Sequence, residues 1–281
     1  MTMDGAFRLI ATVVTDTCRA ALGAQVTGDE LGLRLAELIT AAVLVRETTQ
    51  PVRRVQLVWR DRRGGSLVAD SLPEGQCRGL VNPGESVPVL IAGDHRLHVN
   101  YMSPRGEPYQ GIIGVPDGHD FATALMLYFK QSEQITAMVA LTALPGPGGV
   151  RAVGGYVLQV TPEATQHGID VMLAHLAKLP PIAELLEGRG RTAYQLGKVV
   201  FEGWDHADLA SSPLGFGCTC SELRVMTSIL TLPTAEVDSM LEGDTLEIRC
   251  DGCGRNYRIE PATLRDFRDR AAQLEANDAP V

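Results

Sequence analysis

The feature that most constrains this chain is the placement of its cysteines. Four of the six lie in the last quarter of the sequence, as Cys218-Thr219-Cys220 and as Cys250-Asp251-Gly252-Cys253. The 29 residues between the two pairs are enough for a short helical excursion and a return. Zinc imposes no geometry of its own and binds four thiolates in a tetrahedral shell. The sequence therefore predicts one zinc ion bound by Cys218, Cys220, Cys250 and Cys253.

A shell of four thiolates leaves no open position for a hydrolytic water, which excludes a catalytic zinc. Two interpretations remain open. In the first, zinc is structural and supplies about 10 kcal/mol or more of folding free energy to a small module. In the second, oxidants convert the thiolates to disulfides, so that zinc and its folding free energy are lost. A thiol oxidoreductase working through Cys250 and Cys253 is disfavoured, because a redox Cys-x-x-Cys normally opens a helix and this one lies between predicted strands.

The other candidate residues are predicted to be structural. Cys18 and Cys77 stand alone in apolar or mixed surroundings, and a free cysteine of that kind behaves as a small buried hydrophobe. His95 and His98 are three positions apart in a predicted strand. They should point to opposite faces, as surface histidines rather than as ligands of one metal. Glu133 has no evident histidine partner for a hydrolase triad and is expected to hold the fold.

The charge balance excludes several classes of partner. The formal net charge is -9 and the pI is near 5.2, whereas nucleic-acid binding depends on Lys and Arg displacing counterions from phosphates. The N-terminus lacks a secretory pattern, and no run is long and apolar enough to span a membrane. No G-x-x-x-x-G-K-[ST] loop for nucleotide phosphates occurs. We therefore expect a soluble cytoplasmic protein that binds no nucleic acid, membrane or ATP.

The predicted fold class is α+β, and residues 1–165 are expected to form an N-terminal domain with a mixed sheet. Leu31–Val45 repeats apolar residues at helical spacing, which predicts a helix with one apolar face. Asp120 can cap a second helix that runs through Phe129. Apolar runs between turn-forming residues predict strands at 55–59, 66–70, 88–91, 97–101, 111–115, 135–144 and 150–160.

Two smaller segments follow. In 166–217, the helical runs Ile169–Leu179 and Ile182–Glu187 are separated by two prolines. Helices this short depend on tertiary docking, so the segment is either a conditionally ordered, metastable linker or a plain helical one. In 218–275, a helix between Pro233 and Gly243 precedes a hairpin around the second cysteine pair. The hairpin strands are predicted at 246–249 and 257–259.

Several segments resemble the heat shock protein 33 family of redox-regulated chaperones. The stretches Phe216–Ser221 and Ile248–Tyr257 look like the family's C-x-C and C-x-x-C zinc module. In the first domain, Pro108–Ile112, Tyr128–Ile135 and Ala152–Gln159 resemble family segments in the same order. The resemblance therefore covers most of the chain, although at one position, Leu223, family members usually carry glutamate.

This resemblance implies an ATP-independent holdase that is inactive while reduced and zinc-bound. Oxidation would form the disulfides Cys218–Cys220 and Cys250–Cys253, release zinc and unseat the linker of residues 166–217. The exposed apolar surface would then bind unfolding client proteins during oxidative stress, and the active form would be a homodimer. The alternative is a zinc-stabilised binding protein, or a constitutive chaperone, in which the zinc is purely structural and no redox switch exists.

Overall fold

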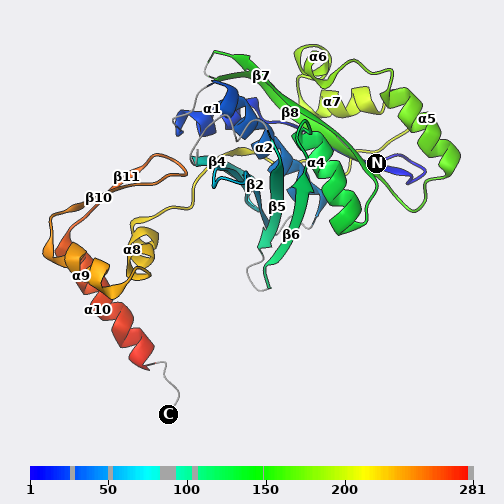
Figure 1. The fold of residues 1–281 in the computed structure, drawn as a ribbon. Helices are drawn as coiled ribbons and strands as arrows, with labels where there is room; N and C mark the ends of the chain where they lie inside the picture. The colour runs from blue at the N-terminus through cyan, green and yellow to red at the C-terminus, as the bar shows by residue number, and fades with distance from the viewer. Residues whose placement is uncertain (26–28, 50–52, 83–92, 103–106, 148, 278–281) are drawn as a thin grey trace. The chain divides into compact units, whose positions relative to one another are not determined.

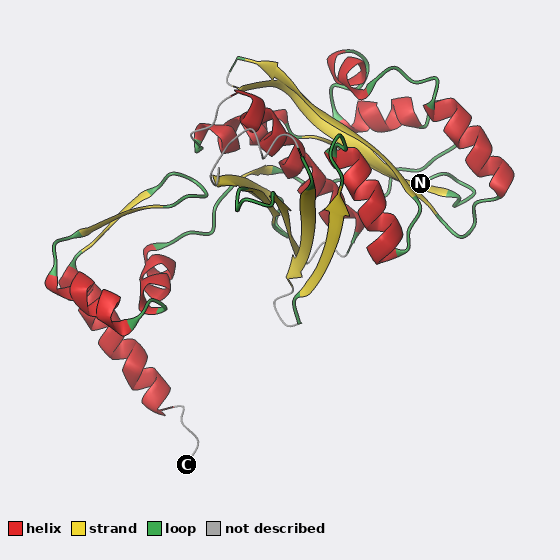
Figure 2. Cartoon of the chain, in the orientation of Figure 1, coloured by secondary structure: helices red, strands yellow, loops and turns green. Residues whose placement is uncertain are grey.

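The chain folds into two compact units, Met1–Gly217 and Cys218–Val281. The structure, a computed structural model, describes residues 1–25, 29–49, 53–82, 93–102, 107–147 and 149–277. The first unit contains a six-stranded and a three-stranded sheet, and the second contains a two-stranded hairpin among helices (Figures 1 and 2). The predicted α+β class is therefore confirmed.

The six-stranded sheet has the order β6-β5-β2-β3-β4-β9. Its strands are β2 (Arg54–Arg60), β3 (Ser66–Ser71), β4 (Gln76–Asn82), β5 (His95–Met102), β6 (Tyr109–Val115) and β9 (Gly215–Phe216). All neighbours pair antiparallel except β4 and β9, which pair parallel, so the sheet is mixed as predicted. The predicted strands at 55–59, 66–70, 97–101 and 111–115 are confirmed, and the one at 88–91 lies outside the described residues.

The three-stranded sheet is antiparallel with the order β1-β8-β7. Its strands are β1 (Phe7–Val13), β7 (Ala137–Gly146) and β8 (Gly149–Val160). The short helix α1 (Thr15–Gly23) follows β1 directly. The two long strands predicted around residue 147 are thus confirmed as β7 and β8.

The helix α2 (Asp29–Thr48) lies between the two sheets, packed against β2 and β3 on one side and β7 and β8 on the other. Its residues from Leu38 to Arg46 are buried without interruption. The predicted helix is confirmed, but the prediction of a single apolar face is wrong. A helix that is covered on both sides needs apolar residues around its whole circumference.

The helix predicted after Asp120 is confirmed as α4 (Phe121–Tyr128), and the Asp120 carboxylate accepts a hydrogen bond from the Thr123 amide at 2.8 Å. It continues into a π-helical turn, η1 (Phe129–Glu133). The Glu133 carboxylate accepts hydrogen bonds from the hydroxyls of Tyr128 and Tyr101, which ties this turn to β5. These bonds agree with the structural role predicted for Glu133.

The expectation that His95 is a surface residue is wrong. Its side chain is buried and stacks on the Trp59 ring, with 4.6 Å between the ring centroids. His98 lies on the opposite face of the same strand, as expected, and is half-buried. The prediction failed for His95 because strand alternation assigns two faces without saying which of them meets the core.

Three short helices follow β8 in residues 166–217: α5 (Gln166–Leu176), α6 (Ile182–Glu187) and α7 (Ala193–Val200). They cover the face of the three-stranded sheet that points away from α2. Phe7, Tyr156 and Leu158 of the sheet form one apolar cluster with side chains from the helices. The helical contributors to that cluster include Met172, Leu185, Leu186, Leu196, Val199 and Val200.

The second unit contains α8 (Glu222–Leu230), α9 (Thr234–Glu242), the hairpin of β10 (Leu246–Arg249) and β11 (Asn256–Ile259), and α10 (Pro261–Asn277). The helix and hairpin predicted for this region are confirmed as α9 and β10–β11. The cluster of buried apolar side chains at its core is small, comprising Met226, Ile229, Val237, Leu241, Ile259 and Leu264. Across the described parts of the chain, no helix is both long and apolar enough to cross a bilayer.

Candidate metal centre

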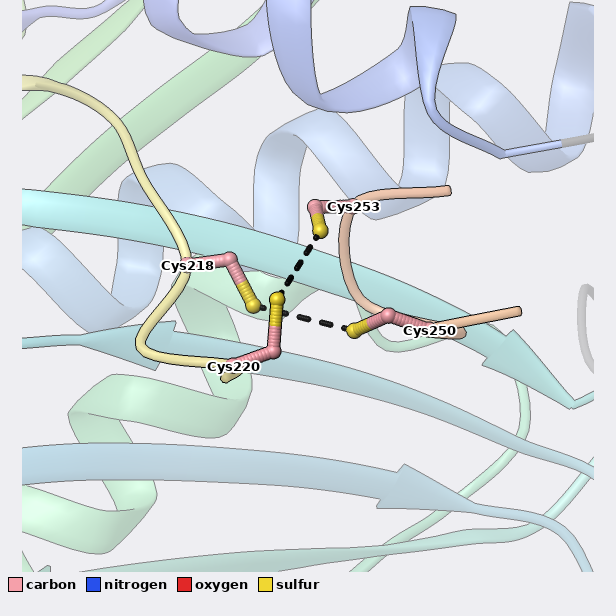
Figure 3. Close-up of side chains that lie close together, drawn as sticks. All are labelled: Cys218, Cys220, Cys250 and Cys253. Carbon is pink, nitrogen blue, oxygen red and sulfur yellow. Dashed lines mark hydrogen bonds between the residues drawn. The ribbon is translucent and has the colours of Figure 1, made fainter. Parts of the chain in front are cut away.

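Two loops of the second unit bring the four predicted cysteines together (Figure 3). Cys218 and Cys220 lie just before α8, whose first turn is capped by the Ser221 hydroxyl. Cys250 and Cys253 lie in the turn between β10 and β11. That turn is closed by hydrogen bonds from the Cys250 amide to the Arg255 carbonyl at 2.8 Å and from the Gly254 amide to the Cys250 carbonyl at 2.7 Å.

The spacing of the sulfur atoms suits a metal ion with four thiolate ligands. All four Sγ atoms lie within 4.8 Å of one another. The Sγ atoms of Cys218 and Cys250 are 3.8 Å apart, and those of Cys220 and Cys253 are 3.4 Å apart. Four sulfurs each about 2.3 Å from a central zinc, at the corners of a tetrahedron, would be about 3.8 Å apart. Donor type and spacing therefore both fit.

A hydrogen bond from Tyr257 makes Cys220 more acidic than Cys250 and Cys253. The Tyr257 hydroxyl, on β11, donates this bond to Cys220 Sγ at 3.0 Å. Burial disfavours the Cys220 thiolate, but this bond and those from the other three thiols outweigh burial and lower the Cys220 pKa to about 7. Burial raises the pKa of Cys253 to about 12 and also raises that of Cys250. In the metal-free cluster, Cys220 therefore becomes a thiolate, the form that binds metals and reacts with oxidants, at lower pH than Cys250 or Cys253.

Two arginines near the site differ in their contacts. Arg224 donates to the carbonyl and hydroxyl oxygens of Thr219, at 3.1 and 2.7 Å, so its guanidinium fixes the first cysteine loop. The Arg255 guanidinium interacts with the Tyr257 hydroxyl and, through its charge, with Cys220 and Cys253. The contacts of Arg224 and Arg255 could not be assigned from their closeness in sequence to the cysteines. The hydrogen bond from Tyr257 to Cys220 was not predicted either. The position of Tyr257, seven residues after Cys250, carries no recognisable signal.

Cys18 and Cys77 lie apart from this cluster, in the first unit. Both side chains are fully buried, as predicted. Burial raises the pKa of Cys77 to about 11 and that of Cys18 further. Within the described residues, the four-cysteine cluster is the one group of three or more Cys, His, Asp or Glu side chains close enough to share an ion.

Comparison with known proteins agrees with this geometry. The sequence model of the family described as Hsp33 protein matches residues 1–260. A protein of Desulforamulus reducens named "33 kDa chaperonin" is 28% identical, with 97% of this chain and 96% of that protein covered. One of the same name from Syntrophotalea carbinolica is 29% identical, with 94% and 96% covered. In structure, the 33 kDa chaperonin (heat shock protein 33 homolog) of Thermotoga maritima matches with a TM-score of 0.82 over 97% of both chains, at 20% identity.

Proposed function

This chain belongs to the Hsp33 family of chaperones, and on that premise we propose that it is a redox-switched holdase. The four-sulfur cluster is the observation that carries the proposal. In the reduced protein, Cys218, Cys220, Cys250 and Cys253 hold one zinc ion. This form is inactive, and oxidation of the cluster activates it without ATP.

Zinc is the metal that this donor set favours. Soft thiolates select zinc over hard cations such as magnesium and calcium, and four of them close the coordination shell. The ion would supply Lewis acidity that keeps the thiols ionised and would cross-link the two loops. Since the second unit buries only a small apolar core, much of its stability would come from this cross-link.

The activating step is oxidation of the thiolates by a peroxide or by hypochlorous acid. One thiolate of a pair attacks the oxidant and becomes a sulfenic acid, and its neighbour then displaces water to form the disulfide. Each disulfide removes two electrons from the protein, so two equivalents of oxidant reach the fully oxidised state. The pairing Cys218–Cys220 and Cys250–Cys253 follows from the family resemblance.

Unfolding of the cluster would affect the linker of residues 166–217 through the chain that joins them. The backbone just before Cys218 is held to the first unit by a two-residue parallel pairing, in which the Gly215 amide donates to the Gly75 carbonyl and the Gly217 amide to that of Cys77. Unfolding of the cysteine loops would remove the anchor at the end of this pairing. The short helices α5 to α7 would then lose their C-terminal tether.

The surface that would be exposed is the sheet face under these helices. Phe7, Leu158 and Tyr156 are buried beneath α5 to α7, and their apolar area would become available to unfolding clients. Burial of apolar surface contributes about 25 cal/mol per Å², so the exposed apolar side chains of a client would favour this face. The oxidised form would also be a homodimer, as the family resemblance implies.

The test is client aggregation in the presence of reduced or oxidised protein. We expect the oxidised protein to suppress aggregation of a chemically unfolded enzyme and the reduced protein not to do so. If zinc stays bound, or if both forms are equally active, the alternative applies: a constitutive chaperone or binding protein with a purely structural zinc. Insulin-reduction turnover, which a thiol oxidoreductase would show, is expected to be absent.

A further inference from the structure

The outer edge of β1 is an unpaired strand edge. β1 is the terminal strand of the three-stranded sheet and pairs with β8 without a register shift. At the two ends of β1, the Ala6 carbonyl accepts a hydrogen bond from the Thr161 amide and the Val14 amide donates to the Val153 carbonyl, both toward β8. The Phe7 carbonyl instead accepts from the Thr2 amide, on the side of β1 that faces away from β8. Because the direction alternates along an antiparallel strand, the amides and carbonyls of Leu9, Ala11 and Val13 point away from the sheet.

These three residues have no hydrogen-bond partner for their outward groups among the described residues. The N-terminal segment satisfies Phe7 through Thr2, whose hydroxyl also accepts from the Phe7 amide at 3.0 Å, and it goes no further along the strand. A row of unpaired amides and carbonyls is the template to which another strand adds. Most native edges are blunted by proline, a bulge or inward-pointing charge, and Leu9, Ala11 and Val13 provide none of these.

The edge opens into a groove with a volume of about 730 Å³. The helix α7 forms one wall with Tyr194 and Gly197, together with Phe201, which follows the helix, and α2 forms the other with Val43 and Glu47. The residues of β1 from Arg8 to Val13 form its floor. The groove also contains the Thr12 side chain, whose hydroxyl is buried without a partner among the described residues. The groove therefore combines apolar side chains with charged ones such as Arg8, Glu47 and Asp208, beside the unused backbone groups of the strand edge.

A strap of residues 206–214 runs along this groove without pairing to the strand. Its start is held by paired backbone bonds between Ala207 and Met1, both 2.9 Å. Its end is held by the bond from the Gly215 amide to the Gly75 carbonyl at 3.1 Å. Between these anchors Leu209 is 63% exposed. The strap belongs to the segment that the proposed switch would release.

We propose that the edge of β1 binds one extended segment of an unfolded client by β-strand addition, in the groove that the strap occupies. The client backbone would donate to and accept from Leu9, Ala11 and Val13, while its side chains would contact α7 and α2. Main-chain pairing is indifferent to sequence, which suits a partner whose only common feature is an exposed backbone. This inference rests on the proposed chaperone function and adds the site and mode of client binding.

The walls of the groove favour a single strand over a second copy of this protein. A symmetric dimer formed edge to edge through β1 would bring a second sheet, with its own α2 and α7, against the same edge. Because α2 and α7 both pack against β1, the two helix pairs would collide before the strands reached the 4.8 Å or so that a ladder requires. A lone extended segment has no such flanks.

Amide hydrogen exchange on the full-length protein tests this directly. The probe is reduced, carboxymethylated α-lactalbumin, a chain that stays unfolded, added to whichever redox form binds it. We expect exchange at Leu9, Ala11 and Val13 to slow at least tenfold on binding. The amides of Ile10 and Thr12, already bonded to β8, and that of Leu141, on the opposite edge of the sheet, should not change. Unchanged exchange at Leu9, Ala11 and Val13 in a saturated complex would overturn the proposal.

A proline substitution provides a second readout. Ala11→Pro removes an amide that the β1–β8 ladder does not use and should weaken binding of the probe about tenfold, equivalent to about 1.4 kcal/mol. The control is Leu141→Pro, a proline on the outward edge of β7, for which we expect unchanged affinity. Equal affinity of the Ala11→Pro variant and the wild type would contradict strand addition.

The two proposals fail in distinguishable ways. Whether the reduced or the oxidised protein binds the probe tests the proposed redox switch. Which amides exchange more slowly in the complex tests the proposed binding edge. Slowing along β1 in both redox forms would overturn the switch and support the edge. Slowing confined to the face under α5 to α7, or concentration-dependent slowing of β1 amides without the probe, would overturn the edge proposal in favour of face binding or of self-association.

Discussion

At the scale of single residues, Tyr257 controls the reactivity of the cysteine cluster. Its hydroxyl bonds to Cys220 Sγ at 3.0 Å. In the zinc-bound cluster, where all four sulfurs would already be thiolates, a hydrogen bond to a thiolate lowers the nucleophilicity of that sulfur. We predict that Tyr257→Phe keeps one zinc per chain but loses it about fivefold faster in peroxide, since a hydrogen bond of this kind contributes about 1 kcal/mol. A chromogenic chelator follows the release. Tyr109→Phe, a change at an exposed phenol in the first unit, should leave the rate unaltered.

The buried thiol of Cys77 makes stability depend on pH in the alkaline range. Burial raises its pKa from 9.0 to about 11 in the folded protein, so the folded state holds the proton more tightly than the unfolded chain. The resulting stabilisation is fully present below pH 9 and is lost as the pH rises to 11. We predict that the stability difference between wild type and Cys77→Ala, measured by urea unfolding, shrinks by about 2–3 kcal/mol across this range. A constant difference would contradict the prediction.

Residue-level prediction from the sequence succeeded where spacing carries the chemistry. Two cysteine pairs indicate convergence because thiolates that share an ion must meet, and all four do meet. The burial of Cys18 and Cys77 also followed from their neighbours. The Tyr257 bond and the stacking of His95 on Trp59 depend on which side chains face each other across strands, and a single sequence does not encode that pairing locally.

At the scale of elements, the docking of α5 to α7 decides how easily the linker leaves the sheet. Leu196 of α7 is fully buried in the cluster that joins these helices to the sheet. Leu196→Ala should destabilise this docking by about 2–5 kcal/mol and give the reduced protein part of the holdase activity. Leu173→Ala is the matched control, because Leu173 of α5 is 45% exposed. Protease cleavage within residues 166–217 should increase for Leu196→Ala and stay at the wild-type level for the control.

Elements with strong local signals could be predicted, and those fixed by packing could not. The capped helix after Asp120 and the strands β7 and β8 follow from periodicity. The strand β4 was missed because Gly79 interrupts its pattern. A Cβ there would lie 2.8 Å from the Leu35 side chain, so glycine is needed for contact with α2. The helix α7 was missed because Gly197 lies inside it, and tertiary docking outweighs that penalty.

At the scale of the whole molecule, the two units should respond differently to loss of metal. The first unit has an extensive core built on α2, whereas the core cluster among the described residues of the second contains only six buried apolar side chains. We predict that a strong chelator, under reducing conditions, abolishes the dispersed amide NMR signals of residues 218–277. The signals of β2, β3 and β5 should persist. Dispersed signals from the second unit in metal-free protein would show that its core folds without the ion.

The arrangement of strands into two sheets around α2 was beyond prediction from this sequence. Pairings such as Phe7 with Val160 and Gly215 with Gln76 join residues far apart in the chain, and local patterns do not specify such partners. The boundary between the two compact units lies at Cys218, the first cysteine of the four-sulfur cluster. By contrast, the linker helices belong to the first compact unit, because their apolar faces complete the three-stranded sheet.

The measurement that tests the central claim most directly is zinc release and client aggregation followed together in one sample. Reduced protein with a chromogenic chelator and an unfolding enzyme is treated with hypochlorous acid. The account predicts that one equivalent of zinc is released and that aggregation suppression begins on the same time course. Suppression that is complete before oxidation, or zinc release without any gain in suppression, would contradict the switch.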